Sequence, residues 1–526
     1  MSTKVFHYGQ DHLTAGIALS IARGEMVGVL TDATKEAINV SSEIVAQIAA
    51  EPAAVYGINT GFGPLCTTKI SAEETGKLQE NLLKSHAVGM GEPIRPILTK
   101  LMMVLKVQAL AKGHSGVRLS TIEKILWFLD NGITPVVPSQ GSVGASGDLA
   151  PLSHLFLPLI GEGNVLSCDG TVMSTSLMAE YKKDYAPIKL GPKEGLGLIN
   201  GTQFIAAHAV LVVEKMQNLL ANADITGAMM IEGLLGSVKP FSPELHELRP
   251  FPGNRHVAAS ISNLLKDSEI LHSHANCARV QDPYSLRCIP QVHGASRTAW
   301  LHLKELLEIE LNSVTDNPVI FTKDHTISGG NFHGQPLAMA LDYATLAAAE
   351  IGNISDRRSY LALTGDTPGV PKLLIKDAGT NSGFMIPQYT AAAIASENKS
   401  LCFPASADSI PTSLGQEDHV SMGSISGRKA LQVVENVEKI LGIELFSAAQ
   451  AMDFHAPLKS SKILSAVYRV VREKIEHLTE DRFLQPDMEV AHALISTATL
   501  PATAKQAAEE NQEPYATEWS AQFDNF

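Results

Sequence analysis

Apolar residues recur at helical spacing along most of this chain. In residues 120–130 they fall on one helical face, and the sequence Ser-Thr-Ile-Glu at the start of this segment predicts a capping box at Ser120. The helix is expected to end at Gly132. Residues 101–112 show the same spacing and stop at Gly113. The pattern indicates helices, in a first half that is rich in glycine.

The second half contains longer amphipathic segments. A helix over residues 334–361 would be about 40 Å long at roughly 1.5 Å per residue. Helices of this length are typical of a helical bundle. The one clear strand candidate is Val319–Thr322. We therefore predict a mainly α fold. The four segments are 202–236, 294–313, 334–361 and 422–452.

The change in character near residue 200 predicts a domain boundary there. We expect residues 1–200 to form a glycine-rich N-terminal domain, residues 201–480 a central bundle of long helices, and residues 481–526 a peripheral C-terminal segment. The tail after Lys505 is polar, and we expect it to fray.

Composition narrows the possible classes of protein. Of the 526 residues 45% are hydrophobic, and the formal net charge is −14, which argues against binding to nucleic acid or to an anionic membrane. The five cysteines are scattered, so neither a disulfide framework nor a zinc site is expected. With no apolar signal region and no uninterrupted membrane span in the sequence, the expected location is the cytoplasm.

The densest chemical signal is the segment Gly-Ser-Val-Gly-Ala-Ser-Gly-Asp-Leu-Ala-Pro at residues 141–151. One interpretation is an ordinary glycine-rich turn before a helix, or a phosphate cradle, although the Lys-Ser/Thr of a P-loop is missing. A second interpretation is chemical. In a compressed turn the nitrogen of Gly147 can attack the carbonyl carbon of Ala145. Loss of water from that ring and from Ser146 leaves a methylidene-imidazolone, an electron-poor alkene.

Further segments occur in a fixed order along the chain. Together with the Ala145-Ser146-Gly147 segment they resemble the aromatic amino-acid ammonia-lyase and aminomutase family, whose prosthetic group is a methylidene-imidazolone made from Ala-Ser-Gly. The segments are Tyr56-Gly-Ile-Asn-Thr-Gly-Phe-Gly63, Ser85-His86-Ala-Val-Gly89, Glu194-Gly-Leu-Gly-Leu-Ile-Asn-Gly-Thr202, Gln281-Asp-Pro-Tyr-Ser-Leu-Arg287, Gly329-Gly-Asn-Phe-His-Gly-Gln335 and Gln416-Glu-Asp-His-Val-Ser-Met422.

The resemblance implies a role for each of these residues. Tyr56 is expected to be the base, and Arg287 to bind the substrate carboxylate, which a planar guanidinium matches in a bidentate fashion. Asn200 is expected to bind the oxygen of the electrophile or the substrate amine, and Tyr284 and Gln281 to line the pocket near Arg287. Without the resemblance, a turn aromatic, a structural ion pair and a loop asparagine would be the ordinary interpretations.

Two positions indicate which amino acid is the substrate. His86 lies in the segment that contacts the substrate ring in this family, and Glu417 stands where relatives that act on phenylalanine or tyrosine resemble Gln. A carboxylate can accept an imidazole N–H and stabilise the charged ring. Phe332 is expected to keep water from the electrophile. The chain departs from the family at Gly197, where Ala is more usual, and at Leu414-Gly415, next to the specificity position.

The predicted function is elimination of ammonia from L-histidine to trans-urocanate, the first step of histidine degradation. Addition of the substrate amine to the electrophile is favoured by the resemblance, and addition of the ring stays open. The alternatives are a tyrosine or phenylalanine ammonia-lyase, an aromatic aminomutase, or a non-catalytic helical scaffold. The resemblance also implies a homotetramer whose active sites are shared between subunits.

No metal or external cofactor is expected, because the histidines that suggest one lack close ligand spacing. These histidines are His154, His293, His333 and His419.

Overall fold

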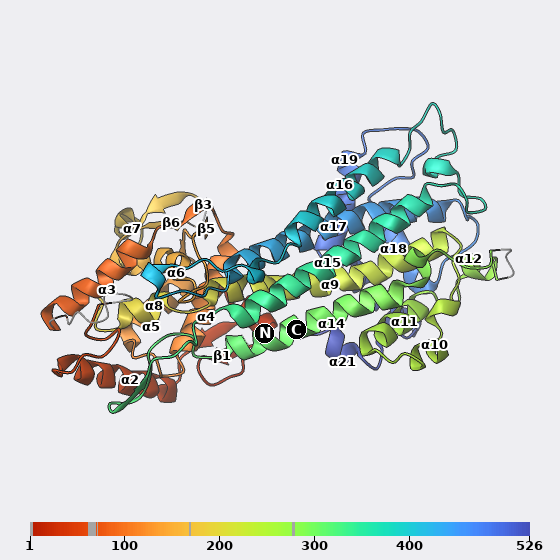
Figure 1. The fold of residues 1–526 in the computed structure, drawn as a ribbon. Helices are drawn as coiled ribbons and strands as arrows, with labels where there is room; N and C mark the ends of the chain where they lie inside the picture. Colours follow the sequence, from red (N-terminus) through yellow and green to blue (C-terminus); the bar gives the residue numbers. More distant parts are fainter. Residues whose placement is uncertain (1–3, 62–69, 71, 168–169, 276–278) are drawn as a thin grey trace. The chain divides into compact units, whose positions relative to one another are not determined.

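The computed structural model describes residues 4–61, 70, 72–167, 170–275 and 279–526. Residues 62 and 63 of the Tyr56 segment lie outside this part, as do Cys66, Cys168 and Cys277. The fold is mainly α, as predicted, with several small sheets in the described part of the chain (Figure 1).

The chain forms two compact units. The first comprises Met1–Leu211, Leu303–Asp342 and Pro404–Arg428, and the second comprises Val212–His302, Tyr343–Phe403 and Lys429–Phe526. Both are discontinuous in sequence, whereas the domain ranges expected from the sequence are continuous. The reason is that each of four long helices begins in one unit and ends in the other. These are α9 (Gln203–Gly233), α14 (Ile289–Leu311), α15 (Gln335–Ala362) and α17 (Gly423–Asp453).

The four long helices coincide with the four amphipathic segments to within a few residues, so that prediction is confirmed. Helix α9 is long and apolar enough to cross a membrane, but 72% of its most apolar window is buried inside the protein. A core helix has the same composition, because a helix that is apolar all round must be covered by protein or by lipid.

The first unit holds the sheets of the described chain and eight helices besides its share of the long ones. Its helices are α1 (Ala15–Ala22), α2 (Asp32–Ala50), α3 (Ala72–His86), α4 (Pro96–Leu110), α5 (Leu119–Asp130), α6 (Leu149–Phe156), α7 (Thr175–Tyr181) and α8 (Glu194–Ile199), with the 3-10 turns η2 (Leu157–Ile160), η5 (Ala405–Ala407) and η6 (Ser413–Gly415). The predicted capping box is wrong. Helix α5 begins at Leu119 after Arg118, so Ser120 is already inside the first turn and does not cap it.

The sheets are small and local. Strands β1 (Val5–His7) and β2 (Val27–Val29) pair in parallel, and β3 (Met90–Pro93) pairs antiparallel with β5 (Pro138–Gln140). Strands β4 (Thr134–Pro135), β6 (Asn164–Leu166) and β7 (Val172–Ser174) form an antiparallel sheet in that order. The predicted strand at residues 319–322 is confirmed: β8 (Val319–Thr322) pairs with β9 (His325–Ile327).

The second unit contains further helices around its share of the long ones. They are α10 (Pro243–Glu247), α11 (Pro252–Leu264), α12 (Glu269–His272), α13 (Tyr284–Arg287), α16 (Met385–Leu401), α18 (Lys462–Arg472), α19 (Gln485–Ser496), α20 (Thr499–Asn511) and α21 (Ser520–Phe523), with the turns η3 (Lys239–Phe241) and η4 (Lys372–Leu374). A buried ion pair between Arg358 and Glu444 lies in its core.

The expected fraying of the tail is wrong. Helix α20 continues to Asn511 and packs against α18, and the Phe523 side chain is only 4% exposed. Apolar residues spaced among the polar ones fix this segment, because each is buried against the unit.

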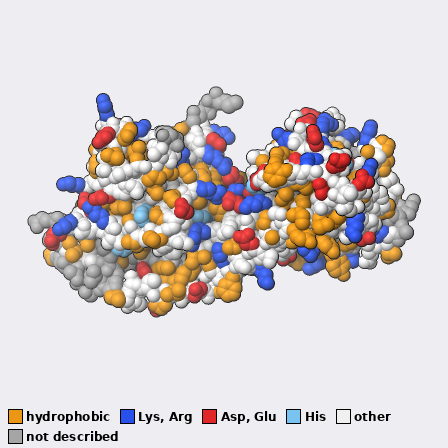
Figure 2. All heavy atoms as spheres, turned by 90° about the horizontal axis from the view of Figure 1, so that it is seen from above, with side chains coloured by type: hydrophobic (Ala, Val, Ile, Leu, Met, Phe, Trp, Pro, Cys, Tyr) orange, Lys and Arg blue, Asp and Glu red, His pale blue; other side chains and the backbone are white. Residues whose placement is uncertain are grey.

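Large apolar side chains are also exposed on the long helices of the second unit. They include Tyr343, Leu346 and Tyr360 on α15 and Ile386 and Tyr389 on α16. Figure 2 shows one face of the molecule, on which hydrophobic patches lie between charged side chains. Exposed apolar patches of this kind are typical of surfaces that bind another protein.

Candidate functional site

The turn at Ala145-Ser146-Gly147 is packed directly against the backbone at Gly201. Gly147 has a φ of +74°, and a Cβ atom added there would clash with the carbonyl oxygen of Gly201. The amide of Asp148 donates to that same oxygen at 2.7 Å. Only glycine permits this approach, and Ala145 beside it is buried against Val420 and Met422.

Asp148 ties the turn to the first residues of α9. Its buried carboxylate accepts hydrogen bonds from the amides of Phe204 at 3.1 Å and Ile205 at 3.0 Å, and from the Ser142 hydroxyl at 2.8 Å. Burial raises the pKa of Asp148 to about 7 in spite of these bonds. The aspartate therefore caps α9, and not α6, which it precedes in sequence.

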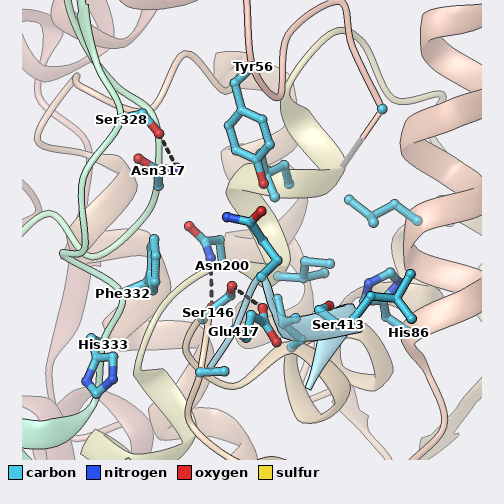
Figure 3. A pocket seen from close by; sticks show the side chains of 18 of the residues that line it. Tyr56, His86, Ser146, Asn200, Asn317, Ser328, Phe332, His333, Ser413 and Glu417 are labelled. Atoms are coloured by element: carbon cyan, nitrogen blue, oxygen red, sulfur yellow. Dashed lines mark hydrogen bonds between the residues drawn. The ribbon is translucent and has the colours of Figure 1, made fainter. Parts of the chain in front are cut away.

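Three side chains from distant parts of the sequence meet at Ser146. The Ser146 hydroxyl donates to Oε1 of Glu417 at 2.5 Å, and Nδ2 of Asn200 donates to the Ser146 carbonyl oxygen at 2.7 Å (Figure 3). The second carboxylate oxygen of Glu417 accepts from Thr412 at 2.9 Å. Among the described residues, Oδ1 of Asn200 is buried without a hydrogen-bond partner, so this oxygen is available to a donor that is not part of the chain.

This group of residues lines a cavity of about 850 Å³. Tyr56 lies in a turn and reaches in from the top of the view in Figure 3, while His86 at the end of α3 reaches in from the right and Phe332 from the left. The cavity is of the size expected for a small-molecule site.

His86 is half-buried beside this cavity, and its Nδ1 lies 2.9 Å from the Ser85 hydroxyl. Burial lowers the pKa of His86, while the Leu82 backbone and the charge of Glu417 act in the opposite direction. The imidazole is therefore neutral near neutral pH, with a carboxylate in its vicinity. Six of the site residues predicted from the sequence line this one cavity. They are Tyr56, His86, Ser146, Asn200, Phe332 and Glu417.

The cavity also has walls that sequence analysis did not assign to it. Asn317 donates from Nδ2 to Ser328 at 3.1 Å and accepts the Gly329 amide at 2.7 Å, which fixes one wall. The rings of His333 and His419 stack with centroids 5.5 Å apart. Both histidines belong to segments that carried the resemblance, but we considered them only as metal ligands. No local pattern marks Asn317.

Gln281, Tyr284 and Arg287 form a cluster of their own on and beside α13, in the second unit. Nη2 of Arg287 donates to Gln281 at 2.9 Å, and the guanidinium lies over the Tyr284 ring at 4.7 Å. Nε of Arg287 is buried with no partner in the described chain, and Tyr284 is 71% exposed. The residues that line the cavity all belong to the first unit.

In the part of the chain that the structure describes, no three His, Cys, Asp or Glu side chains gather where they could hold a metal ion. Two of the histidines considered as ligands have other contacts: Nε2 of His154 accepts the Gly89 amide at 3.0 Å, and His293 pairs with Asp224. The absence of a metal or an external cofactor stays a prediction.

Comparisons with known proteins agree with one another. The family model for aromatic amino acid lyases matches residues 13–473. A histidine ammonia-lyase from Natranaerobius thermophilus is 48% identical over 477 residues, which cover 90% of this chain and 93% of that protein. The crystal structure of histidine ammonia-lyase from Trypanosoma cruzi superposes with a TM-score of 0.89 at 38% identity, over 99% of this chain and 97% of that one. Tyrosine aminomutase from Streptomyces globisporus gives 0.90 at 34% identity, over 95% and 98%.

Proposed function

The chain belongs to the aromatic amino acid lyase family, and from that premise we propose that it removes ammonia from L-histidine to give trans-urocanate, the first step of histidine degradation. It is a carbon–nitrogen lyase. The observation that carries the choice of histidine is the carboxylate of Glu417, which reaches Ser146 at 2.5 Å inside the cavity. The named histidine ammonia-lyases among its relatives support the same choice.

We propose that Ala145, Ser146 and Gly147 form a methylidene-imidazolone without any external cofactor. The residues fit such a group. Position 147 must be glycine, because a Cβ atom there would clash with Gly201, and Asn200 already donates to the Ser146 carbonyl oxygen. When present, the group supplies an electron-poor alkene that makes the substrate amine easier to expel. The family is consistent with this chemistry.

Asn200 and Tyr56 serve the reaction directly in this proposal. The Asn200 amide stabilises negative charge that develops on the Ser146 carbonyl oxygen, because a preorganised donor needs no reorientation during the reaction. Its unpartnered Oδ1 accepts from the substrate ammonium. Tyr56 removes the β-proton. A free phenol has a pKa of roughly 10, so it needs a positive field to act near neutral pH.

His86 and Glu417 recognise the imidazole ring of the substrate. The carboxylate accepts one ring N–H, and the neutral His86 faces the same cavity. Phe332 covers the cavity on the other side and excludes water.

Arg287 binds the substrate carboxylate, supported by Gln281 and Tyr284. Its unpartnered Nε and the exposed Tyr284 ring indicate a surface that receives a further group. We propose that this further group comes from another subunit, so that each active site of a homotetramer combines residues of different subunits. The exposed apolar side chains on α15 and α16 support such an assembly. We also propose that the protein is cytoplasmic.

A tyrosine or phenylalanine lyase, or an aminomutase, is the second candidate, because the fold also matches tyrosine aminomutase. Glu417 speaks against phenylalanine, since a phenyl ring offers a carboxylate no donor; a phenol offers an O–H, so the choice between histidine and tyrosine rests on the named relatives and on the absorbance test. The third candidate is a non-catalytic scaffold, which predicts a chain at its full encoded mass.

The first test is ultraviolet absorbance with L-histidine, L-tyrosine and L-phenylalanine offered separately to the wild type and to Glu417→Gln. We expect absorbance growth with histidine alone, and a loss in kcat/KM of about 10²-fold in the variant, because an amide lacks the charge that stabilises the imidazole. Gln can still accept from Ser146, so folding should be unchanged. Asp408→Asn, an exposed acid in the same loop, is the control for loss of charge. Turnover of tyrosine or phenylalanine by the wild type would refute the histidine assignment.

A further inference from the structure

Lys106 is a buried lysine that the proposed reaction does not use. It lies on α4, its side chain is 1% exposed, and its Nζ donates to the carbonyl oxygens of Asn200 at 2.7 Å and Gly197 at 2.9 Å. The Gly197 carbonyl belongs to the last turn of α8, and Asn200 is the residue that caps the end of this helix. A cation at that position neutralises the negative end of the helix and satisfies carbonyls that the helix itself leaves unpaired.

The bonds of Lys106 lead directly to the reacting centre. Lys106 holds the backbone oxygen of Asn200, and the side chain of the same residue donates to the Ser146 carbonyl oxygen. The next residue, Gly201, carries the oxygen that the Asp148 amide binds. The backbone at residues 200 and 201 is thus fixed by Lys106 and by the turn that contains Ser146.

We propose that Lys106 is a positioning residue: it holds the backbone of Asn200 so that the Asn200 amide stays on the Ser146 carbonyl oxygen. This inference rests on the proposed function of Ser146 and Asn200. A purely structural lysine would stabilise α8 equally well, whatever side chain stood at position 200.

The electrostatic surroundings of Lys106 determine its pKa and its hydrogen-bond partners. Burial lowers its pKa to about 7, against the opposing charges of Asp316 and Asp148, and the charge of Lys193 acts in the same direction as burial. Asp316 is itself paired with Lys193 at 2.7 Å. Among the described residues, Lys106 pairs with no carboxylate, and its Nζ donates to the carbonyl oxygens of Gly197 and Asn200.

The position of the Asn200 amide matters twice. During maturation Ser146 must lose its Cα proton and its hydroxyl as one water molecule while the Cα–Cβ double bond forms. Ring closure between Gly147 and Ala145 releases a second water. A donor on the Ser146 carbonyl acidifies the adjacent Cα–H, so a displaced amide slows this maturation as well as turnover.

The test is a double-mutant cycle between Lys106→Met and Asn200→Ala, with Arg118→Gln as the control. Arg118 holds the other end of α8 through Glu194 and does not contact Asn200. Two quantities are measured for each variant: the fraction of chains that lack two water molecules, by intact mass, and kcat and KM per matured chain.

Alone, Lys106→Met should lower kcat by roughly 10- to 100-fold with KM changed less than about threefold. In the Asn200→Ala background it should cost less than about twofold, because the amide it positions is gone. The matured fraction should follow the same pattern. Arg118→Gln should cost the same factor in both backgrounds. Equal losses from Lys106→Met with and without Asn200 would overturn the proposal.

Lys106→Gln repeats the cycle if the methionine variant does not fold, since an amide can still donate to one carbonyl. The same criterion applies to it. The two proposals fail differently. A wild type that lacks two waters but is silent with histidine would refute the substrate assignment, while the mass readout would still test Lys106.

Discussion

The turn at Ser146 and the cluster at Arg287 carry opposite halves of the proposed chemistry and are built in opposite ways. Around Ser146, its hydroxyl donates to Glu417, Asn200 donates to its carbonyl oxygen, and the Gly201 carbonyl accepts from the Asp148 amide, all within the first unit. Around Arg287, in the second unit, the guanidinium donates to Gln281 and lies over the Tyr284 ring, and Nε has no hydrogen-bond partner in the described chain.

This difference teaches what each region requires. Forming an electrophile from the backbone needs a tightly packed turn, because a loose turn would not bring the Gly147 nitrogen to the Ala145 carbonyl. Binding a carboxylate needs a cation that keeps an unused donor, as Nε of Arg287 does among the described residues. A group that lacks its partner in one copy of the chain is consistent with sites shared between copies.

Ser146→Ala should have the largest effect, because it removes the electrophile from the packed region. We expect kcat with histidine to fall at least about 10⁴-fold, and the variant chain to keep its full encoded mass. The melting temperature should change little, since Thr412 still donates to Glu417. Activity within tenfold of the wild type would show that Ser146 is not the source of the electrophile.

Arg287→Met should be next, with a loss in kcat/KM of roughly 10² to 10³-fold, because the substrate carboxylate loses a bidentate partner. Arg287→Lys should have a kcat/KM between those of the wild type and Arg287→Met, since lysine keeps the charge but not the bidentate geometry. Co-expression of Arg287→Met with Ser146→Ala should restore part of the activity if sites combine subunits. No recovery in isolated mixed oligomers would contradict the sharing of sites.

The buried interior of the first unit should also affect the pH dependence of stability. His208 is fully buried in α9, and burial lowers its pKa to about 4, with Arg428 and Arg95 adding to the shift against the opposing bond to Phe204. The unfolded chain takes up this proton near pH 6.5 and the folded protein near pH 4. The free energy of unfolding therefore falls as pH falls from 6.5 to 4.

Urea unfolding at pH 7 and pH 5 measures this effect in the wild type and in His208→Gln. The wild type should lose about 2 kcal/mol more than the variant over this interval. Protein concentration is held fixed, because an oligomer's stability depends on it. Equal losses in both proteins would mean that water reaches His208.

Gly197→Ala should have the smallest effect, and its sign tests how tightly α8 is packed. Alanine favours a helix by about 1 kcal/mol over glycine, but its Cβ would lie 2.7 Å from Cγ2 of Val117. We expect a net destabilisation of about 1 kcal/mol in the single variant. In a Val117→Ala background the same change should stabilise. The melting temperatures of the wild type, the two single variants and the double variant measure the sign of the change in each background.

Much of the fold could be predicted because its signals are local. The ends of α9, α14, α15 and α17 follow from apolar spacing. The errors arose where the outcome depends on contacts outside the local sequence. The start of α5 depends on where the chain enters the helix, and the order of the tail depends on what Phe523 packs against. Neither can be read from a short window.

The site divides in the same way. The sequence alone named Ser146, Asn200, His86 and Glu417, since each lies in a recognisable segment. Asp148 directly precedes α6 in the sequence, and only the structure shows that its side chain caps α9. The sequence does not mark Asn317 or Lys106, which have no local pattern.

The sequence by itself thus determined the helical class of this protein and its family, and it singled out the residues that we propose form its electrophile. Only the tertiary structure brought Glu417 to Ser146 across 271 positions and placed Lys106 beneath Asn200. The physical reason is the range of the two kinds of information. Helix periodicity and glycine-rich turns are set by neighbours along the chain, whereas contacts between distant segments are set by packing and by the need to pair every buried polar group.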